Sequence, residues 1–110
     1  MAKIITHTLE IPKNATRWWI KKSHDDTAKK RRGEDRLEVI VDNYRKSKNC
    51  KIEFSSTQLG NGKVRLVIKN SFQNQADLDG YLAILEPYAA EMDAYHAEAN
   101  ITSIDTITEE

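Results

Sequence analysis

Residues 50–72 read CKIEFSSTQLGNGKVRLVIKNSF. Apolar and polar side chains alternate over Cys50–Ser56 and again over Lys63–Phe72. This period of two is typical of a β-strand with one buried face. The Asn61–Gly62 pair between the two runs predicts a type I′ turn, in which both residues take positive φ. We therefore expect an antiparallel hairpin whose apolar side chains lie on the core.

A strand is expected on each side of this region. Apolar residues and His7 alternate with polar residues over Ile4–Ile11, and Pro12, which lacks a backbone N–H, ends the run. The segment 101–108 is rich in β-branched residues and is a candidate for a last strand.

Two longer helical regions flank the hairpin in the sequence. Over Glu34–Lys48 apolar residues recur at i, i+3, i+4 and i+7, the pattern of a helix with one buried face. Asn74 caps a second region whose apolar stripe runs to Ala99. Pro87 interrupts this stripe, so we expect a kink or two helices that meet near Glu86.

This order of elements, strand–helix–strand–strand–helix–strand, predicts an α+β fold. In one layer it is the ferredoxin-like split βαβ arrangement, an antiparallel sheet with helices on one face and the first and third strands at its centre. Residues 13–33, which are basic and contain both tryptophans, would enlarge the first crossover.

Length and composition indicate one domain. The 110 residues leave no room for two cores, so we treat 1–110 as one domain with residues 109–110 frayed. Hydrophobic residues make up 39% and charged residues 31%, which is a globular composition. No apolar run reaches the roughly 18 residues of a membrane span. The single cysteine excludes an intrachain disulfide, and we expect a cytoplasmic protein.

The net charge of zero hides an uneven distribution. Residues 1–55 hold 14 Lys and Arg against 8 Asp and Glu, a charge of +6, and residues 56–110 hold 3 against 9, a charge of −6. This asymmetry indicates either a contact surface for a charged partner or two halves that fold together and neutralise one another.

The sequence contains no recognisable catalytic or cofactor motif. GxGxxG, P-loop and GxSxG patterns are absent, and we expect no cofactor. Asp93 and His96 form one imperfect half of a di-metal motif, so we expect a surface pair rather than a metal site. Cys50 alternates with apolar residues, which favours a buried thiol over a nucleophile. His7 shares a strand face with apolar residues and is expected to be a satisfied histidine at the core edge.

The segment around the two tryptophans carries most of the basic excess. Asn14 is a candidate cap for a short helix through Lys22, with a break at residues 23–26. We expect at least one tryptophan in the core. Aromatic rings and cations are also the components of single-strand nucleic-acid binding. The candidate patch for nucleic acid or another partner consists of Arg17, Trp18, Trp19, Lys21, Lys22, Lys29, Lys30, Arg31 and Arg32.

A second candidate surface lies on the last helical region. Three tyrosines recur there at heptad spacing and share one helix face. Tyrosine is enriched at protein interfaces, although this face would also serve to pack on its own sheet. The candidate protein interface consists of Tyr81, Tyr88, Met92, Tyr95, Glu86, Glu91 and Asp93.

From these observations we expect a small non-enzymatic interaction module. Its expected partner is a protein, which the acidic C-terminal third would bind as an inhibitor or modulator of a nucleic-acid-handling machine, and a homodimer is also compatible. A nucleic-acid-binding protein that uses residues 13–36 is the second hypothesis. The third is a small dimeric α+β enzyme with a pocket between sheet and helices, in which His7 or a tyrosine acts.

Overall fold

The computed structural model describes residues 2–25 and 37–110. Within these residues the elements follow one another in the order β1 (Lys3–Pro12), α1 (Trp18–Asp25), α3 (Leu37–Ser47), β2 (Lys51–Gln58), β3 (Lys63–Phe72), α4 (Gln75–Leu85), the 3-10 helix η1 (Glu86–Tyr88), α5 (Ala89–Ala99) and β4 (Thr102–Glu109).

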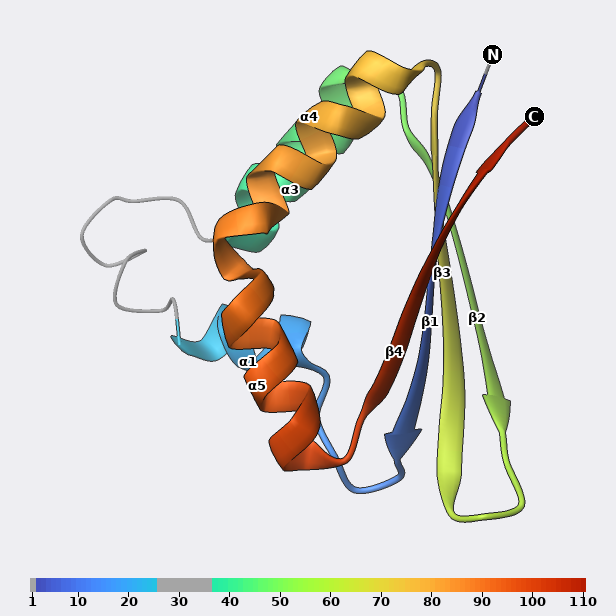
Figure 1. Ribbon diagram of the computed structural model, residues 1–110, viewed down its shortest axis with the longest axis vertical. Helices are drawn as coiled ribbons and strands as arrows, with labels where there is room; N and C mark the ends of the chain where they lie inside the picture. Colours follow the sequence, from blue (N-terminus) through green and yellow to red (C-terminus); the bar gives the residue numbers. More distant parts are fainter. Residues whose placement is uncertain (1, 26–36) are drawn as a thin grey trace.

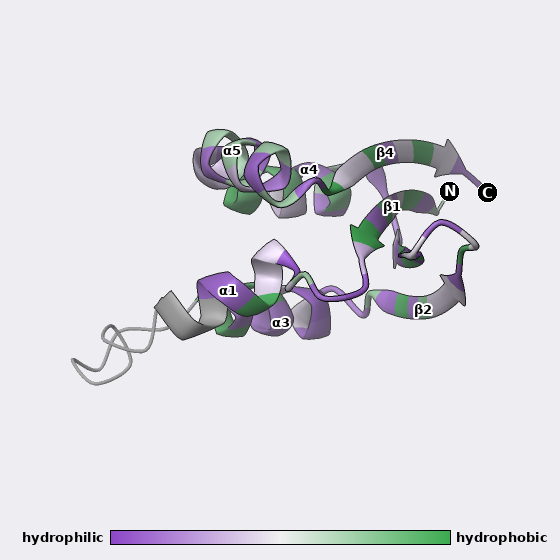
Figure 2. Cartoon of the chain, turned by 90° about the horizontal axis from the view of Figure 1, so that it is seen from below, coloured by the Kyte–Doolittle hydropathy of each residue, from purple (hydrophilic) through white to green (hydrophobic). Residues whose placement is uncertain are grey.

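One antiparallel sheet holds the strands in the order β2-β3-β1-β4. The expected central position of the first and third strands is therefore confirmed. The helices lie on one face of the sheet (Figure 1). Seen from below, α1 and α3 lie level with β2, whereas α4 and α5 lie on the side of β4 (Figure 2). The described chain is thus an α+β structure whose sheet is covered on one face.

The hairpin of β2 and β3 forms as expected, but its turn differs from the prediction. Gly62 has a φ of 80°, whereas Asn61 does not adopt positive φ. The Leu59 N–H donates to the Lys63 carbonyl at 2.9 Å, and the Asn61 side chain accepts from the Lys63 N–H at 3.1 Å. Because four residues rather than two connect the strands, a single residue in the left-handed region completes the reversal. The type I′ prediction is therefore wrong.

The core lies between the sheet and the helices. Trp18 is only 3% exposed, which confirms the expectation that one tryptophan is buried. Ile52 and Phe54 of β2 were expected on the core but are 50% and 57% exposed, because β2 is an edge strand with a neighbour on one side only. The buried cluster consists of Ile5, Trp18, Leu37, Val41, Phe72, Leu78 and Tyr81.

α1 differs from the prediction at both ends. The Ala15 N–H donates to the Pro12 carbonyl at 2.9 Å, so Asn14 lies in the turn after β1 and does not cap the helix. The carbonyl of Arg17 instead accepts the N–H of Lys21 at 3.1 Å. The helix also continues to Asp25, through part of the segment in which a break was expected.

The remaining helices agree with the sequence patterns. α3 confirms the expected helix from Leu37 onward, and residues 26–36 lie outside the described part of the chain. Asn74 caps α4, and its side chain accepts from the Asp77 N–H at 2.9 Å. Pro87 lies in η1, so α4 and α5 meet near Glu86 as expected. None of the helices in the described ranges is long and apolar enough to cross a bilayer.

The last strand forms as β4, and its end is held rather than frayed. The Lys3 ammonium lies 2.8 Å from the Glu109 carboxylate, and the Glu110 N–H donates to the Ala2 carbonyl at 3.1 Å. Two further ion pairs, Lys22–Glu91 at 3.5 Å and Lys48–Asp77 at 3.8 Å, also join the basic half to the acidic half. The two halves therefore fold together and partly neutralise one another.

Candidate functional site

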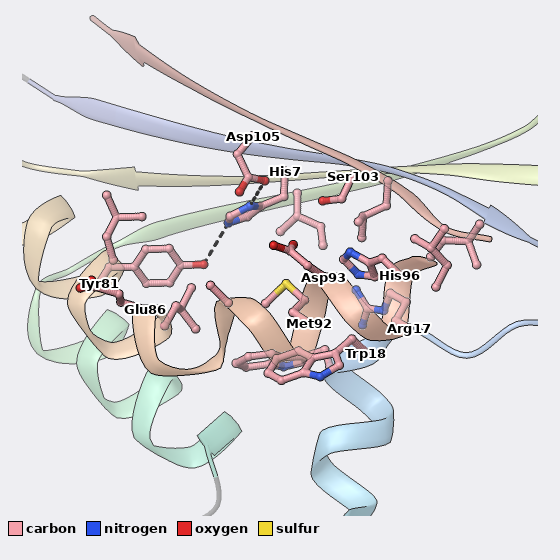
Figure 3. A pocket seen from close by; sticks show the side chains of 18 of the residues that line it. His7, Arg17, Trp18, Tyr81, Glu86, Met92, Asp93, His96, Ser103 and Asp105 are labelled. Carbon is pink, nitrogen blue, oxygen red and sulfur yellow. Dashed lines mark hydrogen bonds and ion pairs between the residues drawn. The ribbon is translucent and has the colours of Figure 1, made fainter. Parts of the chain in front are cut away.

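A cavity of about 400 Å³ lies between the sheet and the helices (Figure 3). Small-molecule sites in proteins measure roughly 300–1,000 Å³ and combine mostly apolar walls with a few polar groups. This cavity has the same composition. Its lining consists of His7, Leu9, Ile11, Arg17, Trp18, Trp19, Arg45, Phe54, Ile68, Tyr81, Leu82, Leu85, Glu86, Ala89, Met92, Asp93, His96, Ile101, Ser103 and Asp105.

Strand register brings polar groups of β1 and β4 to this cavity. His7 lies two residues after the buried Ile5 and therefore shares the helix-facing side of β1. Asp105 lies directly opposite His7 on β4, and Ser103 lies opposite Leu9. Opposed residues of an antiparallel pair point to the same face, so Asp105 and His7 both face the helices.

His7 joins two other elements through both of its ring nitrogens. Its Nδ1 lies 2.7 Å from Oδ1 of Asp105, and its Nε2 lies 3.0 Å from the hydroxyl of Tyr81 on α4. A carboxylate can only accept, so Nδ1 donates to Asp105, and in the tautomer that leaves Nε2 without a proton this nitrogen accepts from the Tyr81 hydroxyl. Asp105, His7 and Tyr81 thus form a chain of hydrogen bonds (Figure 3, dashed lines).

The pKa values of Tyr81 and Asp105, at the two ends of this series of hydrogen bonds, shift in opposite directions. Burial raises the pKa of the Tyr81 hydroxyl, while the positive charge of Arg45, whose guanidinium lies 5.5 Å from the ring centroid, lowers it in part. The hydrogen bond from His7 lowers the pKa of Asp105, and burial opposes this effect. The Tyr81 hydroxyl is therefore protonated and Asp105 is ionised at neutral pH. An ionised carboxylate that orients an imidazole toward a hydroxyl is a known arrangement for moving a proton.

A second group of polar side chains lies at the other end of the cavity. Arg17, the residue before α1, and Asp93 and His96 of α5 line this end of the cavity (Figure 3). His96 is only 9% exposed, so the expectation of a surface pair is wrong for this residue. Burial lowers the pKa of His96, which nearby Asp93 and Asp105 raise in part, so the imidazole is neutral at pH 7.

Cys50 lies near Arg45 and Tyr81 without lining the cavity. It packs against the core, and burial raises the pKa of its thiol while Arg45 lowers it in part. A protonated thiol is a weak nucleophile. No group of three metal-binding side chains occurs within residues 2–25 and 37–110.

The basic patch predicted from the sequence does not form one exposed surface. Trp18 is buried, and both Arg17 and Trp19 line the cavity. A buried Trp18 cannot stack on a base. Lys21 and Lys22 lie over the rings of two tyrosines of the acidic half, at 5.7 and 5.1 Å from the centroids. The other members of the patch lie outside the described residues: Lys29, Lys30, Arg31 and Arg32.

The predicted tyrosine interface packs largely on its own molecule. Tyr81 is 3% exposed, and the Tyr88 ring lies 6.3 Å from the ring of Trp18. The Tyr95 hydroxyl donates to the Thr16 carbonyl at 2.5 Å and ties α5 to the loop before α1. Met92 lines the cavity, and the acidic members of the set are exposed: Glu86, Glu91 and Asp93.

His7 and Tyr81 stand out separately in the sequence, whereas Asp105 and Arg45 do not. One signal for Asp105 was available. Ile107 lies two residues after Asp105, and matching it with Ile5 across the first and last strands would have placed Asp105 opposite His7. The sequence does not indicate a role for Arg45 in the site. Cations are common at the C-terminal end of a helix, where they interact favourably with the helix dipole.

Comparison with known proteins defines the class of fold. No protein-family model and no curated protein matches the chain. A de novo designed protein, Foldit4, has a TM-score of 0.54 at 7% identity and covers 100% of this chain and 99% of its own. A dimeric ferredoxin-like protein from an uncultured marine organism has a TM-score of 0.55 at 14% identity and covers 98% of this chain and 94% of its own.

The chain therefore has a ferredoxin-like α+β fold. At these identities the likeness extends to the fold alone. Foldit4 is a designed protein, which illustrates that this fold does not by itself carry a function. A functional conclusion has to come from the cavity.

Proposed function

We propose that the chain binds a small, mostly apolar molecule in the cavity and exchanges a proton with it through Tyr81, His7 and Asp105. The observation that carries this proposal is the pair of hydrogen bonds of His7, at 2.7 and 3.0 Å, inside a cavity of ligand size. It follows the third hypothesis drawn from the sequence, a small dimeric α+β enzyme, and we rank it above the interaction module.

The proposed step needs no group beyond these three side chains and the ligand. The ligand gives a proton to the Tyr81 oxygen while Tyr81 passes its own proton to Nε2 of His7. The resulting imidazolium keeps its Nδ1–H on the Asp105 carboxylate, which stabilises the new positive charge. The reverse transfers return a proton to the ligand, at the same atom or a neighbouring one, and restore the starting state. A positioned acid or base of this kind contributes about 10²–10⁴-fold to a rate.

Deuterium exchange tests the proposal. The probe is an enolisable aromatic ketone, incubated with the protein in D₂O, and mass spectrometry measures deuterium uptake at the carbon beside the carbonyl. Both tryptophans of the chain line the cavity, so quenching of their fluorescence reports binding independently. Tyr81→Phe keeps the ring in the core, and we expect it to bind the ketone normally but to lose about 10²–10⁴-fold of the exchange rate.

Thr8→Val is the matched control, because Thr8 lies on the opposite face of β1. It should leave both binding and exchange unchanged. If the unmodified protein exchanges the probe no faster than buffer does, or if Tyr81→Phe exchanges it at the same rate, the proton-transfer proposal fails.

Macromolecular binding is our second proposal, and the uncovered sheet face supports it. Across the centre of that face Thr8 lies between Val67 and Ile104, and Ile104 is 63% exposed. The similar marine protein is described as dimeric, so we propose a second copy as the partner. Ile104→Lys should then lower the mass measured by light scattering at tens of micromolar, while Glu98→Lys on α5 should not. A chain that is already monomeric would rule this out.

The finer expectations drawn from the sequence stay predictions. The strand order β2-β3-β1-β4 supports the split βαβ arrangement. We retain three further predictions and rank them after these two proposals. They are a protein partner other than a second copy, a nucleic-acid surface that involves the segment 13–36, and a cytoplasmic location.

A further inference from the structure

The two ends of the cavity differ in chemistry. Tyr81 and His7 lie at one end, and Arg17 lies at the other, across the apolar middle of the cavity (Figure 3). The Arg17 side chain is partly buried, and burial lowers its pKa. A partly buried arginine gains a charge-assisted hydrogen bond when an anion pairs with it.

The described part of the chain does not supply that anion. Within residues 2–25 and 37–110, no carboxylate lies within 4.0 Å of the Arg17 guanidinium. Its guanidinium lies over the face of the Phe54 ring, 5.8 Å from the centroid. That ring is itself exposed on the edge strand β2. The donors of Arg17 therefore stand at the cavity with a hydrophobic ring beneath them and no ion pair.

The remaining charges of the lining indicate which anion fits. The cavity is lined by two arginines, Arg17 and Arg45, and by three carboxylates, Glu86, Asp93 and Asp105. Arg45 is already engaged by Asp42 at 3.3 Å. His96 at the Arg17 end is neutral and adds no positive charge. A dianion such as a phosphate ester carries more charge than the single available cation balances, whereas the one charge and two oxygens of a carboxylate match the fork of one guanidinium.

We propose that the ligand of this cavity is an organic monocarboxylate with an apolar body, whose carboxylate pairs with Arg17. This inference rests on the proposed function. The apolar body then lies along Trp18, Trp19 and Met92 and brings the opposite end of the ligand to the Tyr81 hydroxyl. Arg17 thus sets which end of the ligand reaches the proton-exchanging group. Both aryl-substituted and alkyl carboxylates have this chemistry, so the experiment below uses ligands of both kinds.

A matched set of ligands tests the inference. For a phenylalkyl body and for an octyl body, titration calorimetry and tryptophan quenching compare the carboxylate, the primary amide and the phosphate monoester. We expect the unmodified protein to bind the carboxylate of at least one body tenfold or more tighter than its amide, and tighter than its phosphate ester. In Arg17→Gln the ratio of carboxylate to amide affinity should fall to about one, with amide affinity unchanged within about twofold.

Two further variants make the result specific. Arg65→Gln removes an arginine from the outer face of the sheet, where it lies 3.9 Å from Glu10, and should leave the ratio unchanged. Arg17→Lys keeps the charge and most of the stem but loses the two-pronged donor, so its ratio should fall between those of the unmodified protein and Arg17→Gln. This variant also decides the matter if Arg17→Gln does not fold.

The outcomes separate the two proposals. If the amides bind as tightly as the carboxylates, the carboxylate inference is overturned while the small-molecule cavity stands. Tighter binding of the phosphate esters, or a ratio that Arg17→Lys leaves unchanged, also overturns it. If no member of either series quenches the tryptophans or gives heat, both this inference and the proposed function fail.

Discussion

The burial of His96 couples the stability of the fold to pH. Burial lowers the pKa of its imidazole from the ordinary value of 6.5, so the folded state favours the neutral ring. The stabilising contribution is therefore present above pH 6.5 and is lost as the pH falls through the lowered pKa. Each unit of lowering corresponds to about 1.4 kcal/mol at low pH. As the pH is lowered below 6.5, we expect the urea concentration at the midpoint of unfolding to fall, and to fall less in His96→Gln.

The titration of Asp105 does not contribute to the stability change measured in this pH range. Its pKa is lowered from the ordinary value of 3.8, so its contribution is lost only below that pH. The prediction for His96 is wrong if the urea midpoint changes with pH by the same slope in the unmodified protein and in His96→Gln. Such slopes would mean that the ring is hydrated in the folded state.

At the scale of elements, Gly80 decides how closely α3 and α4 pack. A Cβ at Gly80 would overlap the Tyr44 hydroxyl and lie 2.9 Å from its Cζ. That hydroxyl donates to the Asp77 carbonyl at 2.6 Å and holds the rigid ring in place. Helix propensity alone predicts that Gly→Ala stabilises a helix by about 1 kcal/mol. We expect the opposite for Gly80→Ala, a loss of about 1–3 kcal/mol in the free energy of unfolding.

Chemical denaturation measures this change, and Gly60→Ala is its control. Gly60 lies in the β2–β3 connection with no atom near its missing Cβ, so its substitution should change stability little. A Gly80→Ala protein at least as stable as the unmodified one would show that α3 moves away from α4 without cost.

Tyr88 offers a second prediction about elements, because it packs η1 on α1. Its ring lies 6.3 Å from the ring of Trp18, and the Lys22 ammonium lies 5.1 Å from the same ring. We expect Tyr88→Glu to place a charge against the buried Trp18 and to lower the Tm, by an amount that corresponds to about 1–3 kcal/mol, with no change of mass. Ala90→Glu on exposed α5 is the control. Conversion of a dimer to a monomer at an unchanged Tm would restore the interface interpretation of this tyrosine face.

The elements that sequence predicted well are those in which local pattern and tertiary burial agree. The strand Lys63–Phe72 is one example, since its alternation continues up to the buried Phe72. The helix cap at Asn74 is another, since a cap is a local feature. Predictions failed where the fold overrides local preference: α1 continues to Asp25 past candidate capping residues, and Ile52 lies at a sheet edge that periodicity cannot identify.

The site was only partly predictable for the same reason. His7 and Tyr81 stood out as single residues, but their significance lies in a contact between residues 74 positions apart. Asp105 depends on the register between the first and last strands, and Arg17 depends on where the first crossover lies over the sheet. These contacts arise from tertiary packing, so no short stretch of the sequence predicts them.

At the scale of the whole molecule, the opposite charges of the two halves make stability depend on salt. Ion pairs such as Lys3–Glu109 at 2.8 Å join the halves near the surface. Exposed pairs contribute roughly 0.2–1 kcal/mol each, and salt screens them. We expect the free energy of unfolding to fall as NaCl is raised from low salt to about 0.5 M, where the Debye length is only a few ångströms. Glu109→Gln should lose part of this dependence, and an unmodified protein with no salt dependence would contradict the prediction.

The pairing of β1 with β4 also sets the order in which the molecule assembles. His7 and Asp105 are 98 positions apart, so their contact closes almost the largest loop that the chain allows. Loop closure of this kind slows folding relative to structures built from local contacts. During synthesis all elements from β1 to α5 emerge before β4, so one edge of β1 stays unpaired until β4 is available. The proposed proton-exchanging site is therefore among the last parts to form, and until then the central strand offers an open edge to other chains.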